Sequence, residues 1–138
     1  MYRGQCAEFC GLQHANMKIV VFADSDEDFR AWLARERGPA RVTTTAEAQQ
    51  GEQLFTSGRC GGCHTVRGSP ALGQLGPDLT HVASRQTIAA GALPNDTADL
   101  AAWITHAQSL KPGGLMPDLP QFTGKELRAL VAYLQQLR

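Results

Sequence analysis

The sequence lacks a net charge, and it lacks any long apolar run. Thirteen Lys and Arg residues balance thirteen Asp and Glu residues, so there is no electrostatic basis for binding the phosphates of a nucleic acid. The longest strongly apolar stretch is residues 19–23, whereas a membrane-spanning helix needs about 20 apolar residues. Residues 6–14 hold cysteine, glutamate and histidine where a signal peptide would have its apolar centre. We therefore expect neither a membrane span nor a signal peptide in this sequence.

Aromatic residues are scarce, at 7% of the chain. The apolar share of 43% and the charged share of 19% still fall in the globular range, which excludes a wholly disordered chain. The helix breakers Gly38 and Pro39 divide the sequence. We expect an N-terminal piece over residues 1–37, a linker over residues 38–44 and a domain over residues 45–138.

The N-terminal piece carries one predicted strand and one predicted helix. Residues 17–23 form a short run with several β-branched side chains, which is typical of a buried or half-buried strand. Ser25 can cap a helix in which Phe29 and Trp32 share one face. One strand and one helix cannot build a core. Residues 1–37 are therefore predicted to be part of something larger.

The C-terminal domain is predicted to be mainly helical. A capping box of Thr44 and Glu47 predicts a first helix that ends at Gly58, and a second helix spans residues 97–108. A capping box of Thr123 and Glu126 begins the last helix, and a short helix is expected near residues 78–79. Such helices with long loops bury little apolar surface, so we expect a bulky apolar group among them.

The run Cys60-Gly61-Gly62-Cys63-His64 predicts that group to be a covalent haem. Two thiols spaced by one turn can add to the two haem vinyl groups, and the adjacent histidine then reaches the iron. Three other uses of the four cysteines remain open: two disulfides, a zinc site and a thioredoxin-like redox pair.

Met116 is the predicted second iron ligand. It lies in residues 111–117, a run of glycine and proline that no regular helix or strand accommodates. His/Met ligation fills both axial positions and raises the reduction potential, which favours electron transfer over oxygen chemistry. His81, expected at the surface or the haem edge, and His106, expected to face solvent, are the alternatives to Met116.

Residues 45–138 resemble a class I cytochrome c domain. The resemblance rests on Gly51 and Phe55, the C-x-x-C-H run, residues 76–79, the Met116 loop and Tyr133. It implies a mainly α fold around a covalent haem c, with Gly51 and the aromatic residues at the crossing of the first and last helices. It also implies that the Pro77 carbonyl accepts the proximal imidazole N–H and so orients His64.

A second group of soft ligands lies at the N-terminus: Cys6, Cys10, His14 and Met17. Thiolate, thioether and imidazole select copper over magnesium or calcium. A single blue-copper site uses one cysteine, so two cysteines in this spacing favour a dinuclear site. A Cys6–Cys10 disulfide is the alternative.

This run resembles the ligand loop of the dinuclear copper centre, CuA, in subunit II of haem–copper cytochrome c oxidases. The resemblance implies bridging thiolates from Cys6 and Cys10, one copper on His14, the other on Met17, and a carbonyl ligand from Glu8. It also implies that residues 1–37 are the end of a cupredoxin domain. The family's second histidine is absent from this sequence, so we expect a disulfide or a disordered loop rather than a native copper centre here.

A copper loop followed by a cytochrome c domain is the arrangement of subunit II in caa-type oxidases. This resemblance implies a C-terminal fragment of a membrane-anchored protein on the periplasmic side of the bacterial plasma membrane. Its partners would be subunit I, other oxidase subunits and a soluble electron donor protein, and it needs no catalytic acid, base or nucleophile. A free-standing electron carrier is the alternative function, and a haem sensor or peroxidase is a further one.

Overall fold

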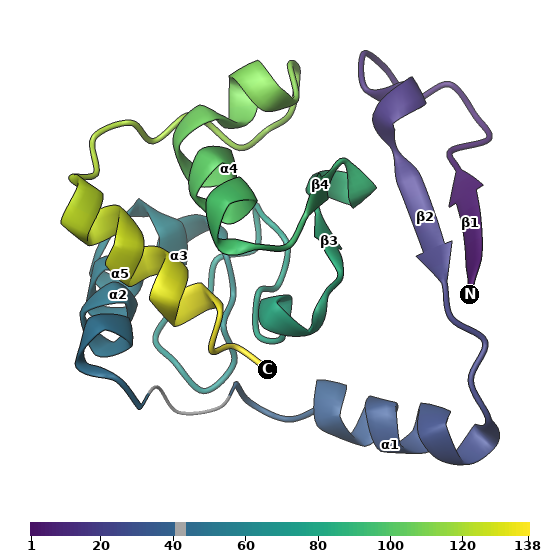
Figure 1. Ribbon diagram of the computed structural model, residues 1–138, viewed down its shortest axis with the longest axis horizontal. Coiled ribbons are helices and arrows are strands. Elements are labelled where there is room, and N and C mark those ends of the chain that lie inside the picture. Colours follow the sequence, from purple (N-terminus) through teal and green to yellow (C-terminus); the bar gives the residue numbers. More distant parts are fainter. Residues whose placement is uncertain (41–43) are drawn as a thin grey trace.

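The computed structural model describes residues 1–40 and 44–138 (Figure 1). Residues 41–43 of the predicted linker lie outside the described residues. The elements follow one another as β1 (Tyr2–Gln5), η1 (His14–Asn16), β2 (Lys18–Val21), α1 (Asp26–Glu36), α2 (Ala46–Ser57), α3 (Arg59–Cys63), η2 (Val82–Ser84), β3 (Thr87–Ile88), η3 (Ala89–Gly91), β4 (Leu93–Pro94), α4 (Thr97–Leu110) and α5 (Gly124–Leu134).

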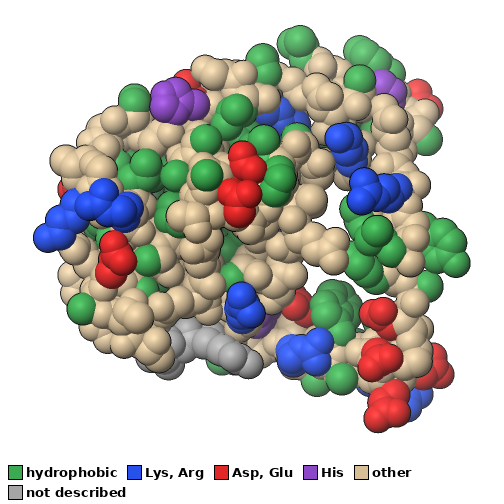
Figure 2. Space-filling model, in the orientation of Figure 1, with side chains coloured by type: hydrophobic (Ala, Val, Ile, Leu, Met, Phe, Trp, Pro, Cys, Tyr) green, Lys and Arg blue, Asp and Glu red, His purple; other side chains and the backbone are tan. Residues whose placement is uncertain are grey.

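Strands β1 and β2 form an antiparallel hairpin that stands beside the helical body (Figure 1). Strand β1 was not predicted, because Tyr-Arg-Gly-Gln has no apolar alternation. The prediction that residues 17–23 are buried or half-buried is wrong. Ile19 is 48% exposed and Val21 is 51% exposed, and within the described residues β1 and β2 form a two-stranded sheet to which no third strand is paired. Figure 2 shows apolar side chains on the surface of this part of the molecule.

Helix α1 begins as predicted. The Ser25 hydroxyl accepts a hydrogen bond from the Asp28 N–H, and acidic residues fill the first turn, where the helix dipole favours them. The rings of Phe29 and Trp32 lie 5.7 Å apart on a face that remains exposed. The prediction that residues 1–37 have no core of their own agrees with this exposure.

The core of the helical body lies where α2 crosses α5 (Figure 1). A Cβ on Gly51 would lie only 1.9 Å from the Ala129 carbonyl oxygen, so the two helices touch backbone to backbone. The Phe55 and Tyr133 rings lie 5.5 Å apart beside this crossing. The largest side chains buried around it are Phe55, Val66, Leu130, Val131, Tyr133 and Leu137.

The helix ends in this body agree with the sequence patterns at some positions and differ at others. The capping box of Thr123 and Glu126 is present. Helix α2, however, is capped by Thr45, whose hydroxyl accepts from the Ala48 N–H, while the Thr44 N–H donates to Gln136 instead. The predicted cap is therefore one residue too early.

The short helix predicted near residues 78–79 is also misplaced. The Asp78 carboxylate accepts from the Thr80 N–H at 2.8 Å, which closes a local turn in place of a helical one. The helical segment is η2, which begins at Val82. No helix in the described part of the chain is long and apolar enough to cross a membrane.

Candidate metal centres

The two thiols of the C-x-x-C-H run lie on one short helix. Helix α2 ends at Ser57, and α3 places Cys60 and Cys63 one turn apart. The His64 N–H closes this turn by donating to the Cys60 carbonyl at 2.8 Å. Both thiols are free, and burial raises the pKa of Cys60. Free thiols one turn apart have the spacing that thioether attachment of a haem requires.

The His64 ring is held from two sides. Its Nδ1 lies 2.8 Å from the Pro77 carbonyl oxygen, so Nδ1 carries the proton and Nε2 is the nitrogen left for a metal. A Cβ on Gly76 would lie 2.4 Å from His64 Cε1, and the ring therefore fills a space that only glycine leaves open. The structure thus brings together His64 and Pro77, as the resemblance implies, and the arrangement fits a proximal iron ligand.

Met116 lies in the loop between α4 and α5 and packs partly buried against the core. The side-chain amide of Gln108 donates to the carbonyl oxygens of Gly114, at 2.8 Å, and Met116, at 2.6 Å. Gln108 therefore holds the loop to the end of α4. Gln108 was not predicted from the sequence, although a polar side chain beside the apolar stripe of a helix was the available signal. The predicted haem ligands lie on two supports: Cys60, Cys63 and His64 on α3 and its C-terminal cap, and Met116 in the loop between α4 and α5.

The two other histidines of the domain differ in burial. His81 is 6% exposed, and its Nε2 lies 3.2 Å from the Gly38 carbonyl oxygen. The expectation that His81 lies at the surface is wrong, because its side chain is buried beside the Gly38 carbonyl. Its expected place at the haem edge stays a prediction. His106 is exposed, as predicted, and its Nδ1 lies 2.7 Å from the Thr105 hydroxyl.

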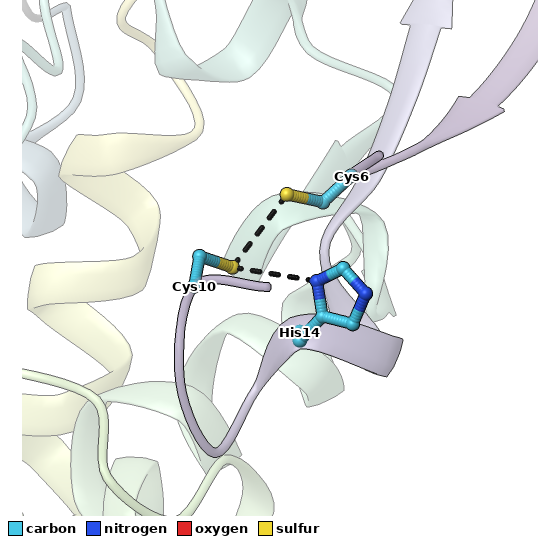
Figure 3. A group of neighbouring side chains, drawn as sticks. All are labelled: Cys6, Cys10 and His14. Atoms are coloured by element: carbon cyan, nitrogen blue, oxygen red, sulfur yellow. Dashed lines mark hydrogen bonds between the residues drawn. The ribbon is translucent and has the colours of Figure 1, made fainter. Parts of the chain in front are cut away.

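The second group of ligands comes together at the end of the hairpin (Figure 3). The sulfur of Cys10 lies 3.6 Å from the sulfur of Cys6 and 3.7 Å from His14 Nδ1, and the three ligand atoms all lie within 4.8 Å of one another. The Cys6 thiol lies 3.1 Å from the Glu8 carbonyl oxygen. The Cys6 N–H also donates to the Met17 carbonyl at 3.0 Å, which closes the loop at its base.

This loop differs from the expectation of a disulfide or a disordered segment. Cys6 and Cys10 are free thiols, and the pairing of β1 with β2 holds the two ends of the loop together. The hydrogen bond from Cys6 raises the pKa of the Cys10 thiol, and the nearby Lys111 ammonium acts in the opposite direction. Two thiols and an imidazole whose ligand atoms converge in this way fit a soft metal such as copper.

Comparisons with known proteins match the helical body to one family and the whole chain to a second group of proteins. Residues 48–138 match the family described as Cytochrome c. Over its whole length the chain is 37% identical to cytochrome c oxidase subunit 2 of Alkalihalophilus pseudofirmus and 30% identical to that of Bacillus subtilis. It spans 40% of the length of each of these relatives. A solved c-type cytochrome, SorU from Sinorhizobium meliloti, is 22% identical, with a TM-score of 0.47 over 66% of this chain and 90% of that one.

The family match covers the two helices that cross at Gly51, the C-x-x-C-H run, Pro77 and the Met116 loop. It confirms the predicted mainly α fold and implies a haem c in this domain. The similarity to oxidase subunit 2 extends over the hairpin and α1 as well. Because the family match covers more than half of the chain, including the helical body and the C-x-x-C-H run, the chain belongs to the cytochrome c family.

Proposed function

We propose that this chain takes an electron from a soluble donor protein and passes it to a CuA centre in a cytochrome c oxidase subunit 2. The observation that carries the proposal is the joint presence of two ligand sets. One is the haem-attachment run at residues 60–64, and the other is Cys6, Cys10 and His14, whose ligand atoms lie within 4.8 Å. A free-standing electron carrier needs only the first set.

Haem c, when bound, supplies a one-electron couple. The chain's own residues decide how that couple is held. Cys60 and Cys63 would hold the haem by thioether bonds, His64 and Met116 would bind its iron, and Pro77 would keep the imidazole in one orientation through its carbonyl. With both ligands bound, the iron would have no site for oxygen or peroxide. This set therefore favours electron transfer over a sensor or peroxidase.

The copper ligands proposed are the thiolates of Cys6 and Cys10, the imidazole of His14, the thioether of Met17 and the carbonyl of Glu8. The Cys6 and Cys10 sulfurs already lie 3.6 Å apart, so both can bind the same metal ions with small movements. Partners of the working protein would be subunit I and other oxidase subunits on one side and the soluble donor on the other. We place this domain on the periplasmic side of the bacterial plasma membrane, where covalent haem attachment takes place.

The test is an electron-injection experiment on the haem-loaded domain within a full-length oxidase subunit 2, because the cluster in this chain offers one imidazole and is not expected to complete the dinuclear copper centre alone. The haem is reduced by a flash-generated reductant, with and without bound copper, and its absorbance is followed. We expect the reduced haem to be reoxidised only when copper is bound, and Cys10→Ser to abolish that step. His106→Ala, an exposed change outside both ligand sets, is the matched control. A haem that stays reduced beside bound copper would support the free-standing carrier instead.

A further inference from the structure

The loop that carries the predicted copper ligands (residues 6–17, the copper-ligand loop) contacts the loop that carries Met116 (residues 111–117, the haem-ligand loop) directly. The side-chain amide of Gln13 donates to the Pro112 carbonyl at 2.9 Å. Beside it, the Leu12 Cβ lies 3.5 Å from the point that a Cβ on Gly113 would occupy. Gln13 directly precedes the ligand His14, and Pro112 lies in the loop that carries Met116. Two loops far apart in the sequence, each carrying metal ligands, therefore meet at this contact.

A second contact lies further down the hairpin and involves an unusual turn. Ala89, Ala90 and Gly91 of η3 all have positive φ angles, of 53°, 57° and 78°, a conformation that alanine rarely adopts. The Lys18 Cβ of strand β2 would lie 2.8 Å from a Cβ on Gly91. The Lys111 ammonium donates to the Ala89 carbonyl at 2.8 Å. Lys111 therefore ties this turn to the start of the haem-ligand loop.

The haem-ligand loop is also held from its inner side. Gln108 binds the carbonyl oxygens of Gly114 and Met116, and the Gly114 N–H donates to the Lys111 carbonyl at 3.2 Å. A continuous series of covalent and hydrogen bonds thus runs from Met116 through Gln108 and Gly114 to Pro112. From there the Gln13 amide continues it to His14 on the copper-ligand loop.

We infer that Gln13 is a positioning residue for electron transfer between the two metal centres. Its amide fixes the copper-ligand loop against the haem-ligand loop and completes the bonded connection between Met116 and His14. The inference rests on the proposed function, since it assumes that both centres are filled in the working protein. The side-chain amide of Gln5, at the end of β1, instead donates to the Ala15 carbonyl within the hairpin.

The surroundings of Gln13 favour one orientation of its amide. The Asn16 side-chain amide donates to Gln13 Oε1 at 3.0 Å, which leaves the Gln13 N–H groups directed at Pro112. Gln13→Glu keeps the acceptor for Asn16 and the length of the side chain, but it removes the donor and places a carboxylate before a carbonyl. Loss of one neutral hydrogen bond changes the equilibrium between the docked and undocked copper-ligand loop about fivefold. Repulsion between the new carboxylate and the Pro112 carbonyl increases this change.

The test measures docking in the haem-loaded, copper-free chain by NMR. The oxidised haem is paramagnetic, so the chemical-shift difference between oxidised and reduced protein reports where each amide lies relative to the iron. We expect the amides of residues 10–17 to fit the same magnetic tensor as the helical body. Gln13→Glu should reduce their shifts by averaging, and it should leave the helical body and the haem potential unchanged.

Gln5→Glu is the matched control, because it makes the same change at a glutamine that binds only within the hairpin. Shifts that stay the same in Gln13→Glu, or that fall equally in Gln5→Glu, would overturn the inference. Failure of the proposed function is distinguishable from both. If no haem is attached, the oxidised and reduced spectra coincide over the whole chain. If the haem passes no electron to copper, the docking shifts persist while flash reduction leaves the haem reduced.

Discussion

Replacing Gly51 with alanine tests the crossing on which the helical body depends. The added Cβ would lie 1.9 Å from the Ala129 carbonyl oxygen and 2.8 Å from the Tyr133 Cβ. Ordinary contact begins at 3.4 Å, so α2 and α5 must separate by about 1.5 Å at this point. The obstacle is backbone rather than the end of a flexible side chain, and no rotamer change can relieve it.

The expected cost lies at the upper end for an overpacked core, about 3 kcal/mol. The separation also loosens the packing of Phe55 and Tyr133, which are buried beside the crossing. For a domain of this size, each kcal/mol lowers Tm by about 4–8 °C, so Gly51→Ala should lower it by about 12–24 °C. This estimate applies to the haem-loaded chain, because a covalent haem stays attached when the chain unfolds.

Guanidinium denaturation followed by far-ultraviolet circular dichroism measures the change. Gly124→Ala in α5 is the matched control, since its added Cβ would meet only the end of the Arg128 side chain, at an ordinary contact distance of 3.6 Å, and alanine favours a helix over glycine by about 1 kcal/mol. We expect the control to unfold at or above the concentration of the unchanged chain. A free energy of unfolding for Gly51→Ala within about 0.5 kcal/mol of the unchanged chain would refute the close crossing.

Four further predictions follow from the sites. Acidic acetone should leave the haem on the protein, and extraction would exclude thioether bonds to Cys60 and Cys63. Met116→Ala should lower the reduction potential, as read by redox titration, because axial ligation moves haem potentials over about 0.8 V; an unchanged potential would exclude Met116 as a ligand. Copper added to the chain should bind without the seven-line electron paramagnetic resonance signal of a mixed-valence pair, since the ligand cluster offers one imidazole; two coppers with that signal would contradict this. Burial, together with the charge of Glu52, raises the pKa of Tyr133 to about 12. As the pH rises, the Tyr133 hydroxyl therefore loses its proton at a lower pH in the unfolded chain than in the folded one. The free energy of unfolding should fall between about pH 10 and 12, by up to about 1.4 kcal/mol per pH unit. Ultraviolet titration should show no Tyr133 phenolate below that range.

Local features of the fold were predictable because they depend on neighbours in the sequence. Ser25 caps α1 and Thr123 caps α5 through bonds to the N–H group three residues on, a spacing that the sequence displays directly. At the start of α2 two threonines compete. Thr45 takes the cap because the Thr44 N–H is drawn to Gln136, which lies far away in the sequence. The pattern was right, and a distant contact decided the residue.

The errors concern burial, which the sequence does not display. His81 was expected at the surface or the haem edge, but its side chain is buried beside the Gly38 carbonyl, 43 positions away in the sequence. Strand β2 is β-branched and was expected to be buried or half-buried, but its side chains are exposed, and β1 is the one strand of the described chain that pairs with it. In both places the residue type was compatible with either environment. Only the path of the rest of the chain decides between them.

The copper-ligand loop has both a feature that was predictable from the sequence and one that was not. Its candidate ligands were predicted from residue types, since thiolates and imidazole favour copper over magnesium or calcium in any fold. Its order was not predicted, because the support comes from two places that the motif does not contain. The pairing of β1 with β2 closes its base, and the Gln13 amide fastens its tip to the loop that carries Met116. The haem-ligand loop is therefore part of the scaffold of the copper ligands, and a change in either loop should be felt at both centres.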